Sequence, residues 1–341
     1  MRLPEPSFAH LRSLTDDIGL FEHAEGVVPR RACGYCVDDV ARALVVVCRE
    51  PMPSADPDLA GLAEIYLAFV LAAQGRDGRF RNRLSLERQW EDEPTVEDCW
   101  GRALWGLGAA VASDLPPVRR AAALAAFARG AGWRSPDSRA MAFAGLGAAE
   151  VLRVEPSNEP AQWLLADVAR RIGRPTQSAT WPWPEDRLRY ANAALPDALI
   201  AAGDALGDES LTADGLQLLQ WLLEVEERDG HLSVTPVAGR GPGDEVGPGF
   251  DQQPIEVATL ADACARAYLL TGDVRWARGL QMAADWFLGA NDGSISLYDM
   301  HTGGGCDGLE RGSRNENQGA ESTLAALSTL QRARRAPVAA R

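Results

Sequence analysis

The chain contains no lysine, so all 34 of its basic residues are arginine. This absence excludes a Schiff-base lysine and the lysine of a phosphate-binding P-loop. No apolar run approaches the roughly 18 residues of a membrane-spanning helix. The opening residues, MRLPEPSFAHLRSL, also lack the apolar stretch of a secretory signal. We therefore expect a cytoplasmic protein with no membrane partner.

Basic residues are in the minority, with 34 Arg against 48 Asp and Glu and a net charge of −14 at pH 7. A surface that binds phosphates needs a surplus of basic side chains, so nucleic acid is excluded as a partner. Six cysteines are too few and too dispersed for a disulfide framework. Cys33 and Cys36 form a C-x-x-C, but the second pair of a zinc site is missing. We expect no metal and no cofactor.

Sequence motifs for several common chemistries are also missing. The chain has no Walker loop, no H-E-x-x-H and no G-x-S-x-G, and its one G-x-G-x-x-G match, GGGCDG at 303–308, follows no predicted strand. What is present is helical periodicity, and no strand-rich region competes with it. The pattern predicts twelve helices, near 3–16, 36–50, 57–74, 95–112, 116–130, 135–153, 159–173, 190–206, 210–227, 252–271, 274–290 and 315–333.

The links between these helices alternate in length, which indicates six helical hairpins. Short links lie at 51–56, 113–115, 154–158, 207–209 and 272–273. Long links lie at 17–35, 75–94, 174–189, 228–251 and 291–314, with 131–134 as the one short exception. Neither polar capping repeats nor sustained heptads are present, so a closed ring is favoured over a solenoid or coiled coil. We predict an all-α (α/α)6 toroid as a single domain over 1–335, with a flexible tail at 336–341.

Internal repetition supports this prediction. Four long links begin alike, with DIGLF at 17–21, DGRF at 77–80, DGHL at 229–232 and DGSI at 292–295. The even-numbered helices are rich in Ala and Gly, as in GRALWGLGAAV and FAGLGAA, which suits an inner ring where backbones crowd. In such a ring all long links and the N-termini of all inner helices share one rim, and the site is expected there.

Carboxylates are frequent on this rim. Any one of them has a structural explanation, because an acid in a first helical turn is stabilised by the helix dipole. However, the second hairpin faces the fifth in a sixfold ring, and two opposed acids are what glycoside hydrolysis requires. We therefore predict a glycoside hydrolase with Asp98 and Asp251 as the central pair, Glu97 and Glu256 as alternates and Asp38 nearby.

Aromatic and amide side chains accompany these acids, as in WPWPED at 181–186 and GFDQQPIE at 249–256. An aromatic ring can stack on the C–H face of a sugar, although packing against the outer helices explains the aromatics equally well. The expected substrate is an oligosaccharide or glycoside. The predicted substrate-binding residues are Asp39, Tyr35, Trp90, Trp181, Trp183, Gln252, Gln253, His231, His301, Glu316 and Gln318.

Two alternatives remain open. His231 and His301 lie in neighbouring long links and can form an acid/base pair for proton abstraction beside a carbonyl, which indicates a sugar epimerase or isomerase. The chain can also be a non-catalytic carbohydrate-binding module that serves a separate glycosyltransferase. Release of reducing sugar indicates hydrolysis, exchange of solvent deuterium into a sugar carbon indicates epimerisation, and oligosaccharide binding without turnover indicates a binding module.

Several segments together carry a resemblance to a known group: GLFEHA, GYCVDDVARAL, DGRFRNRLS, WEDEPTVEDCWGRALWGL, WPWPEDRLRYANAALPDALI, GFDQQPIE and NENQGAESTLAAL. They resemble bacterial helical proteins labelled as glycosyltransferases because a similar domain is fused to true ones. More distantly, the architecture is similar to (α/α)6 glycosidases and to N-acylglucosamine 2-epimerases. The resemblance implies a helical toroid, and it assigns no catalytic residue.

Overall fold

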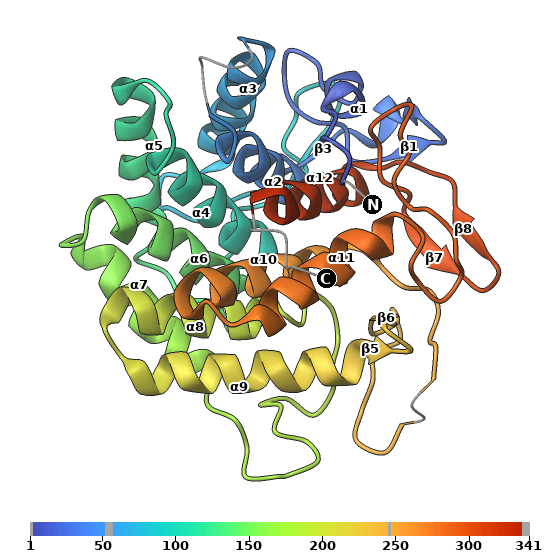
Figure 1. Cartoon of the computed structure of the whole chain (residues 1–341). Helices are drawn as coiled ribbons and strands as arrows, with labels where there is room; N and C mark the ends of the chain where they lie inside the picture. Colours follow the sequence, from blue (N-terminus) through green and yellow to red (C-terminus); the bar gives the residue numbers. More distant parts are fainter. Residues whose placement is uncertain (1–2, 52–56, 245–246, 336–341) are drawn as a thin grey trace.

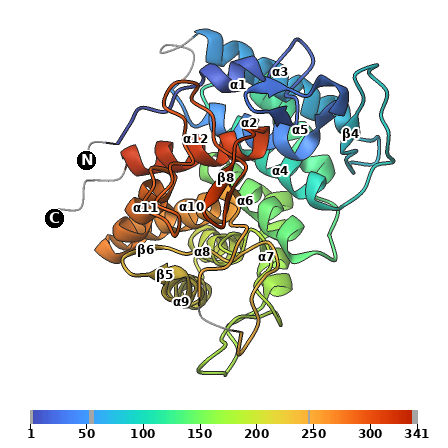
Figure 2. The same cartoon turned by 90° about the vertical axis from the view of Figure 1, so that its right-hand side faces the viewer.

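The computed structural model describes residues 3–51, 57–244 and 247–335. Within them, six inner helices form a ring in which each packs on the next, and the last packs on both its predecessor and the first (Figures 1 and 2). The predicted all-α (α/α)6 toroid is thus confirmed. The inner helices are α2 (Val37–Cys48), α4 (Asp98–Val111), α6 (Ser138–Val154), α8 (Ala194–Leu206), α10 (Pro254–Thr271) and α12 (Ala320–Arg335).

Outer helices cover the ring, and each contacts an inner neighbour. They are α1 (Ala9–Ser13), α3 (Pro57–Ala73), α5 (Pro117–Gly130), α7 (Glu159–Ile172), α9 (Glu209–Glu226) and α11 (Val274–Phe287). The helix predicted at 3–16 is wrong in length, because Pro4 and Pro6 disfavour helical backbone in the residues before them and α1 begins only after Phe8. No helix in the described ranges is long and apolar enough to cross a membrane. The predicted tail at 336–341 lies outside these ranges, and the single-domain assignment stays a prediction.

Glycine lets α4 and α6 meet backbone to backbone. A Cβ added at Gly147 would lie 2.2 Å from the Leu104 carbonyl oxygen, and one at Gly108 would lie 2.2 Å from the Gly147 carbonyl oxygen. Side chains larger than hydrogen do not fit at such distances. The small residues of the inner helices therefore set how closely these two helices approach, as their composition predicted.

The long links carry small two-stranded sheets. The D-G starts form tight turns after outer helices: β5 (Glu227–Arg228) pairs with β6 (His231–Leu232) around Asp229 and Gly230, which have φ of 49° and 84°. Glycine adopts such positive φ without steric cost. The 3-10 turn η1 (Arg31–Cys33) precedes β3. The other pairs are β1 (Ala24–Glu25) with β2 (Val28–Pro29), β3 (Tyr35–Cys36) with β4 (Arg83–Leu84), and β7 (Gly308–Glu310) with β8 (Ser313–Asn315).

A buried ion-pair network links α8, α10 and α12 with the residue that follows α2. Asp262 of α10 accepts hydrogen bonds from Arg49, just after α2, at 3.0 Å and from Arg332 of α12 at 2.7 Å. Burial favours the neutral acid, but the two arginines outweigh it and hold the pKa of Asp262 below its usual value. Beside it, Asp197 of α8 pairs with Arg266 of α10. The network thus joins four inner helices, from the first turn of α8 and the middle of α10 to the last turn of α12.

Candidate functional site

Charged side chains gather where α12, α2 and α4 begin, on the rim with the long links. We call this group the rim cluster; its residues are Asp38, Asp39 and Arg42 of α2, Asp98 and Arg102 of α4, and Glu321 of α12. The acids occupy first helical turns, where the helix dipole favours negative charge, and each arginine lies four residues after an acid. The closed ring brings residue 321 beside residues 38–42.

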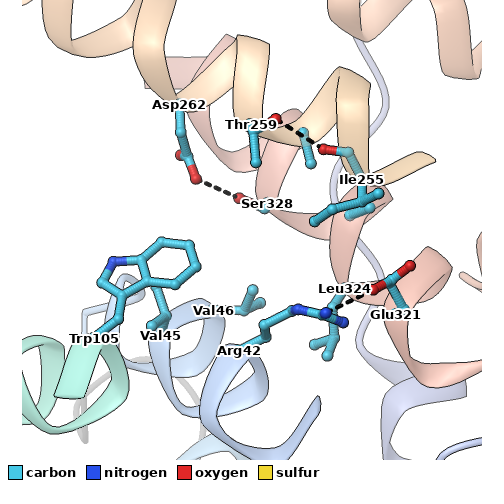
Figure 3. A pocket seen from close by; sticks show the side chains of 12 residues that line it. Arg42, Val45, Val46, Trp105, Ile255, Thr259, Asp262, Glu321, Leu324 and Ser328 are labelled. Carbon is cyan, nitrogen blue, oxygen red and sulfur yellow. Dashed lines mark hydrogen bonds and ion pairs between the residues drawn. The ribbon is translucent and has the colours of Figure 1, made fainter. Parts of the chain in front are cut away.

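Arg42 holds two of the acids. Its Nη1 donates to Asp39 Oδ1 at 2.6 Å. Its Nη2 lies 2.6 Å from Glu321 Oε2, and Figure 3 shows this second pair. Burial favours the neutral form of Glu321, but Arg42 and Arg102 outweigh it and hold its pKa below the usual value. Glu321 therefore stays ionised at neutral pH, while 39% of its side chain remains exposed.

The pKa of Asp98 is shifted in the opposite direction to that of Glu321. It is half-buried, and burial raises its pKa to about 6; Arg102 opposes the rise and the nearby charges of Asp38 and Asp137 add to it. Asp39 is fully buried, and burial raises its pKa to about 7 although Arg42 lies against it. The rim cluster thus contains a carboxylate that stays ionised and a solvent-accessible carboxyl that keeps its proton to higher pH.

Arg102 lies beneath the acids with only 1% of its surface exposed. Its guanidinium carbon is 3.9 Å from the centre of the Phe143 ring, and its Nε is 3.8 Å from Asp38 Oδ1. Within the described part of the chain, its Nε and Nη1 and the Asp38 Oδ1 have no hydrogen-bond partner. The other Asp38 oxygen accepts a hydrogen bond from Asn82 Nδ2 at 2.9 Å. Because Arg102 is close to both Asp98 and Glu321, it favours the ionised form of each.

Glu256 in the first turn of α10 and Asp251 just before that helix lie in different environments. Glu256 is buried and accepts hydrogen bonds from the Ala191 N–H and from the backbone and side-chain N–H groups of Asn192. Burial raises its pKa to about 8. It anchors the link before α8 and presents no free oxygen to a ligand, which corrects its candidacy. Asp251 is exposed, and within the described ranges its side chain forms no hydrogen bond or ion pair. Glu97 is an exposed N-cap of α4.

Most of the aromatic side chains predicted to stack on a sugar are packed against other side chains of the protein. Tyr35 is buried, stacks on Phe21 and donates its hydroxyl to Asp16 at 2.7 Å. Trp183 is buried against Trp221 of α9, and Trp181 meets the same ring edge-on at 5.1 Å. Tyr35 and Trp183 therefore offer no ring face to a sugar. The packing alternative holds for both, because outer elements cover these links.

The remaining predicted aromatic and amide residues also pack or bond internally. Trp90 is half-buried against Phe69 at 5.7 Å. Gln252 is buried and donates to Asp292 at 2.6 Å, and Gln318 is buried and donates to Asp299 at 3.0 Å. These two amides hold links together, so their candidacy as ligand-binding residues is corrected. Gln253 is the half-buried N-cap of α10, and Glu316 is exposed and pairs with Arg314.

The two histidines of the epimerase alternative have separate partners. His231 Nε2 lies 3.0 Å from Asp292 Oδ1, whereas His301 is exposed in a turn that Asp299 holds through backbone N–H groups. Among the described residues no hydrogen bond or ion pair joins the two. His23 is the histidine whose charge influences Glu321, and its Nε2 is 3.5 Å from Glu22. The structure therefore gives His231 and His301 no shared environment.

One group of side chains has the spacing of metal ligands: Glu22, Cys36 and Asp39 offer atoms within 4.8 Å of one another. Arg83 already pairs with Glu22, and Arg42 with Asp39. Burial raises the pKa of the Cys36 thiol well above its usual value, so the thiol stays protonated. Two arginines thus supply the positive charge that these acids need.

The same fold is found in solved structures of enzymes that act on carbohydrates. A sugar epimerase from a ruminal bacterium aligns over 96% of both chains with 12% identity and a TM-score of 0.72. Cellobiose 2-epimerase from Bacillus thermoamylovorans B4167 aligns over 95% of both, with 11% identity and a TM-score of 0.71. The glycoside hydrolase family 9 endoglucanase J30 aligns over 92% of this chain and 73% of its own, with 13% identity and a TM-score of 0.58.

These identities show a shared fold, and the chain has the (α/α)6 toroid of these enzymes. No protein-family description and no curated protein sequence matches it. The resemblance to glycosyltransferase-associated proteins therefore finds no support, while the more distant similarity to (α/α)6 glycosidases and epimerases agrees with the structural neighbours.

Proposed function

We propose that this chain is a carbohydrate-active enzyme that hydrolyses a glycosidic bond at the rim cluster. The observation that carries the proposal is the opposite tuning of two carboxyl groups around one pair of buried arginines. Asp98 keeps its proton up to about pH 6, while Glu321 stays ionised. In a glycosidase, the two catalytic carboxyl groups usually lie in environments that move their pKa values apart. The group with the raised pKa acts as the acid, and the ionised group acts as the base or nucleophile.

Asp98 is assigned as the general acid. Its proton passes to the glycosidic oxygen as the bond to the anomeric carbon breaks, and a pKa of about 6 leaves a useful protonated fraction near neutral pH. Arg102 tunes this group, because its charge keeps the pKa from rising further. Burial against the Phe143 ring holds Arg102 in place.

Glu321 is assigned as the second carboxylate, in place of Asp251. It either removes a proton from the attacking water or attacks the anomeric carbon itself. Both roles require an ionised group with solvent access, and Glu321 has both because Arg42 binds one of its oxygens while 39% of the side chain is exposed. Asp251 has no arginine partner among the described residues.

The fold supports a carbohydrate-active enzyme but does not choose the reaction, since solved structures of similar fold include both a sugar epimerase and a glycoside hydrolase family 9 endoglucanase. Epimerisation by His231 and His301 gains no support, because the His231 ring lies against Asp292, whereas His301 is exposed and bonds to Asp299 only through its backbone N–H. A binding module without catalysis does not need one carboxyl group with a raised pKa and one with a lowered pKa in the same cluster of side chains.

The test is turnover of a panel of oligosaccharides and aryl glycosides, followed by mass spectrometry. Asp98→Asn and Glu321→Gln should each lower kcat/KM by about 10²- to 10⁴-fold. The matched control Asp251→Asn removes an exposed rim acid and should keep full activity. Full activity in both cluster variants contradicts the assignment, and binding without turnover of any glycan contradicts hydrolysis.

The pH dependence is a second test. In wild type, kcat/KM should fall as the pH rises above about 6, because Asp98 loses the proton that it must donate. Arg102→Met should move this alkaline limb to higher pH, since the arginine lowers the pKa of Asp98. An alkaline limb that stays in place in Asp98→Asn shows that another group titrates.

A further inference from the structure

Asn82, in the long link before α4, binds the acidic start of α2. Its side-chain Oδ1 accepts a hydrogen bond from the Asp38 N–H at 3.3 Å, and its Nδ2 donates to Asp38 Oδ2 at 2.9 Å. Its main-chain carbonyl oxygen accepts a hydrogen bond from the Val37 N–H at 2.9 Å. A hydrogen bond to a carboxylate is among the stronger ones in proteins. One amide side chain therefore fixes both the backbone and the carboxylate of Asp38.

Asn82 is itself held by its surroundings. Asp92 accepts hydrogen bonds from the Asn82 N–H at 2.6 Å and from the Arg83 N–H at 3.0 Å. The strand that follows Asn82, β4, pairs with β3 directly before α2. Cys36 of β3 donates its thiol hydrogen to Asn82 Oδ1 at 3.3 Å. The amide thus reaches Asp38 from a segment that is hydrogen-bonded on both sides.

The second Asp38 oxygen faces Arg102 without touching it. Oδ1 lies 3.8 Å from Arg102 Nε, which is too far for a hydrogen bond, and neither atom has a hydrogen-bond partner among the described residues. Because only 1% of Arg102 is exposed, water screens the attraction between the two groups very little. Their other contacts hold them at this distance: Asn82 binds Asp38, and the Phe143 ring packs on Arg102.

Asp98 is the other acid beside Arg102, four residues before it on α4. Burial raises the pKa of Asp98 most, and Arg102 and Arg42 lower it. Two acids of neighbouring inner helices add to the rise, Asp38 of α2 and, with a smaller effect, Asp137, the N-cap of α6. Asp137 already accepts hydrogen bonds from two N–H groups of its own helix. Asp38 is therefore the acid whose placement matters most for Asp98.

We propose that Asn82 and Asp38 are positioning residues that keep on Asp98 the proton that it donates to the glycosidic oxygen. Asn82 fixes the Asp38 carboxylate, whose negative charge disfavours a second negative charge on Asp98. Asp38 also takes up part of the positive charge of Arg102 that would otherwise favour ionised Asp98. The role in proton transfer rests on the proposed function, whereas the electrostatic effect on Asp98 does not.

The experiment follows the protonation of Asp98 directly. The whole chain is labelled with ¹³C at its aspartate carboxyl groups and titrated by NMR, and Asp98→Asn identifies the signal. In wild type the midpoint should lie near pH 6. Asp38→Asn should move it to lower pH by about 1, because a neighbouring like charge has been removed. A midpoint that stays in place or rises in Asp38→Asn overturns the proposal.

Asn82→Ala tests the positioning itself. Without the amide the Asp38 carboxylate can turn away from α4, so the midpoint should fall by less than it does in Asp38→Asn. In the Asp38→Asn background the same substitution should change nothing further, since no charge remains to be positioned. An equal shift in both backgrounds is an effect of the altered link alone, and it overturns the role of Asn82.

The matched control is Asn158→Ala, which removes the side-chain cap of α7 on the other rim. This variant should lower the Tm and leave the Asp98 midpoint where it is in wild type. A midpoint that falls as far in Asn158→Ala as in Asn82→Ala shows that lost stability moves it, and this result also overturns the role of Asn82.

The titration requires no substrate, so failure of this proposal and failure of the catalytic assignment give different results. If the midpoints move as expected but no glycoside is cleaved, the electrostatic role stands and the hydrolase is wrong. If glycosides are cleaved, the alkaline limb of kcat/KM in Asp38→Asn should move to lower pH together with the midpoint. If turnover needs Asp98 but neither the limb nor the midpoint moves, the hydrolase stands and the positioning role is wrong.

Discussion

The contact between α4 and α6 gives a prediction that does not depend on the function. Gly147→Ala places a Cβ 2.2 Å from the Leu104 carbonyl oxygen, and Cβ atoms essentially never approach a heavy atom within 3.0 Å. The two helices must separate by about 0.8 Å, and both contact surfaces are backbone, which cannot rotate away. Overpacking of this kind costs about 3 kcal/mol, and the higher helix propensity of alanine offsets about 1 kcal/mol. The expected net loss is about 2 kcal/mol.

The assay is reversible unfolding in urea together with calorimetry. Unfolding entropy near 2.1 cal/mol/K per residue over 341 residues converts 2 kcal/mol into a Tm decrease of about 3 °C. The matched control is Gly61→Ala in α3, where no atom lies within 4 Å of the added Cβ. There the substitution should stabilise the protein by about 0.4–1 kcal/mol, because alanine restricts the unfolded chain.

The opposite signs of the two substitutions carry the test. If Gly147→Ala is as stable as wild type, α4 and α6 do not meet through their backbones and the crowded inner ring is wrong. If both variants lose stability equally, replacing a helical glycine by alanine is destabilising wherever it is made, and the loss in Gly147→Ala is no evidence for the contact between α4 and α6.

Three other predictions concern residues outside the rim cluster. Asp262→Asn should destabilise the fold by about 3–5 kcal/mol in urea at pH 7, because it leaves two buried arginines without their carboxylate. In wild type the stability that the Asp262 carboxylate contributes should be lost as the pH falls below 3.8, since the pKa of Asp262 is held below that value. Trp181→Phe should lower the Tm and leave KM for glycosides unchanged, because the indole packs on Trp221; a raised KM at unchanged Tm contradicts this. His231→Gln and His301→Gln should keep full turnover, and solvent deuterium entering a sugar carbon would revive the epimerase alternative.

The ring could be predicted because its determinants are local. Alternating link lengths, helix stops and the small residues of 101–108 and 144–148 are all visible in the sequence. The first helix was misjudged where two prolines shorten α1. The small sheets follow from turns such as Asp229-Gly230, whose recurrence was visible although the pairing was not.

The site was only partly predictable, because burial and partners depend on contacts between distant segments. Asp98 and Asp38, which the structure places in the rim cluster, are candidates from the sequence because of their place in first helical turns. Glu321 has the same place on α12 but is not among the predicted residues, since its arginine partner in the cluster lies 279 residues earlier in the chain. Trp183 looked like a ligand-stacking residue because nothing in WPWPED predicts that Trp221 covers it.

Closure of the ring by α12 has a consequence for synthesis. α12 follows the other five inner helices in the sequence, so it leaves the ribosome after them. Because it lies between α2 and α10, it also joins the two ends of the ring. Until then Arg42 lacks Glu321, Asp262 lacks Arg332, and the apolar faces of α2 and α10 are uncovered. A nascent chain that stops before residue 320 therefore has no complete rim cluster, so closure of the ring and completion of the rim cluster depend on the same helix.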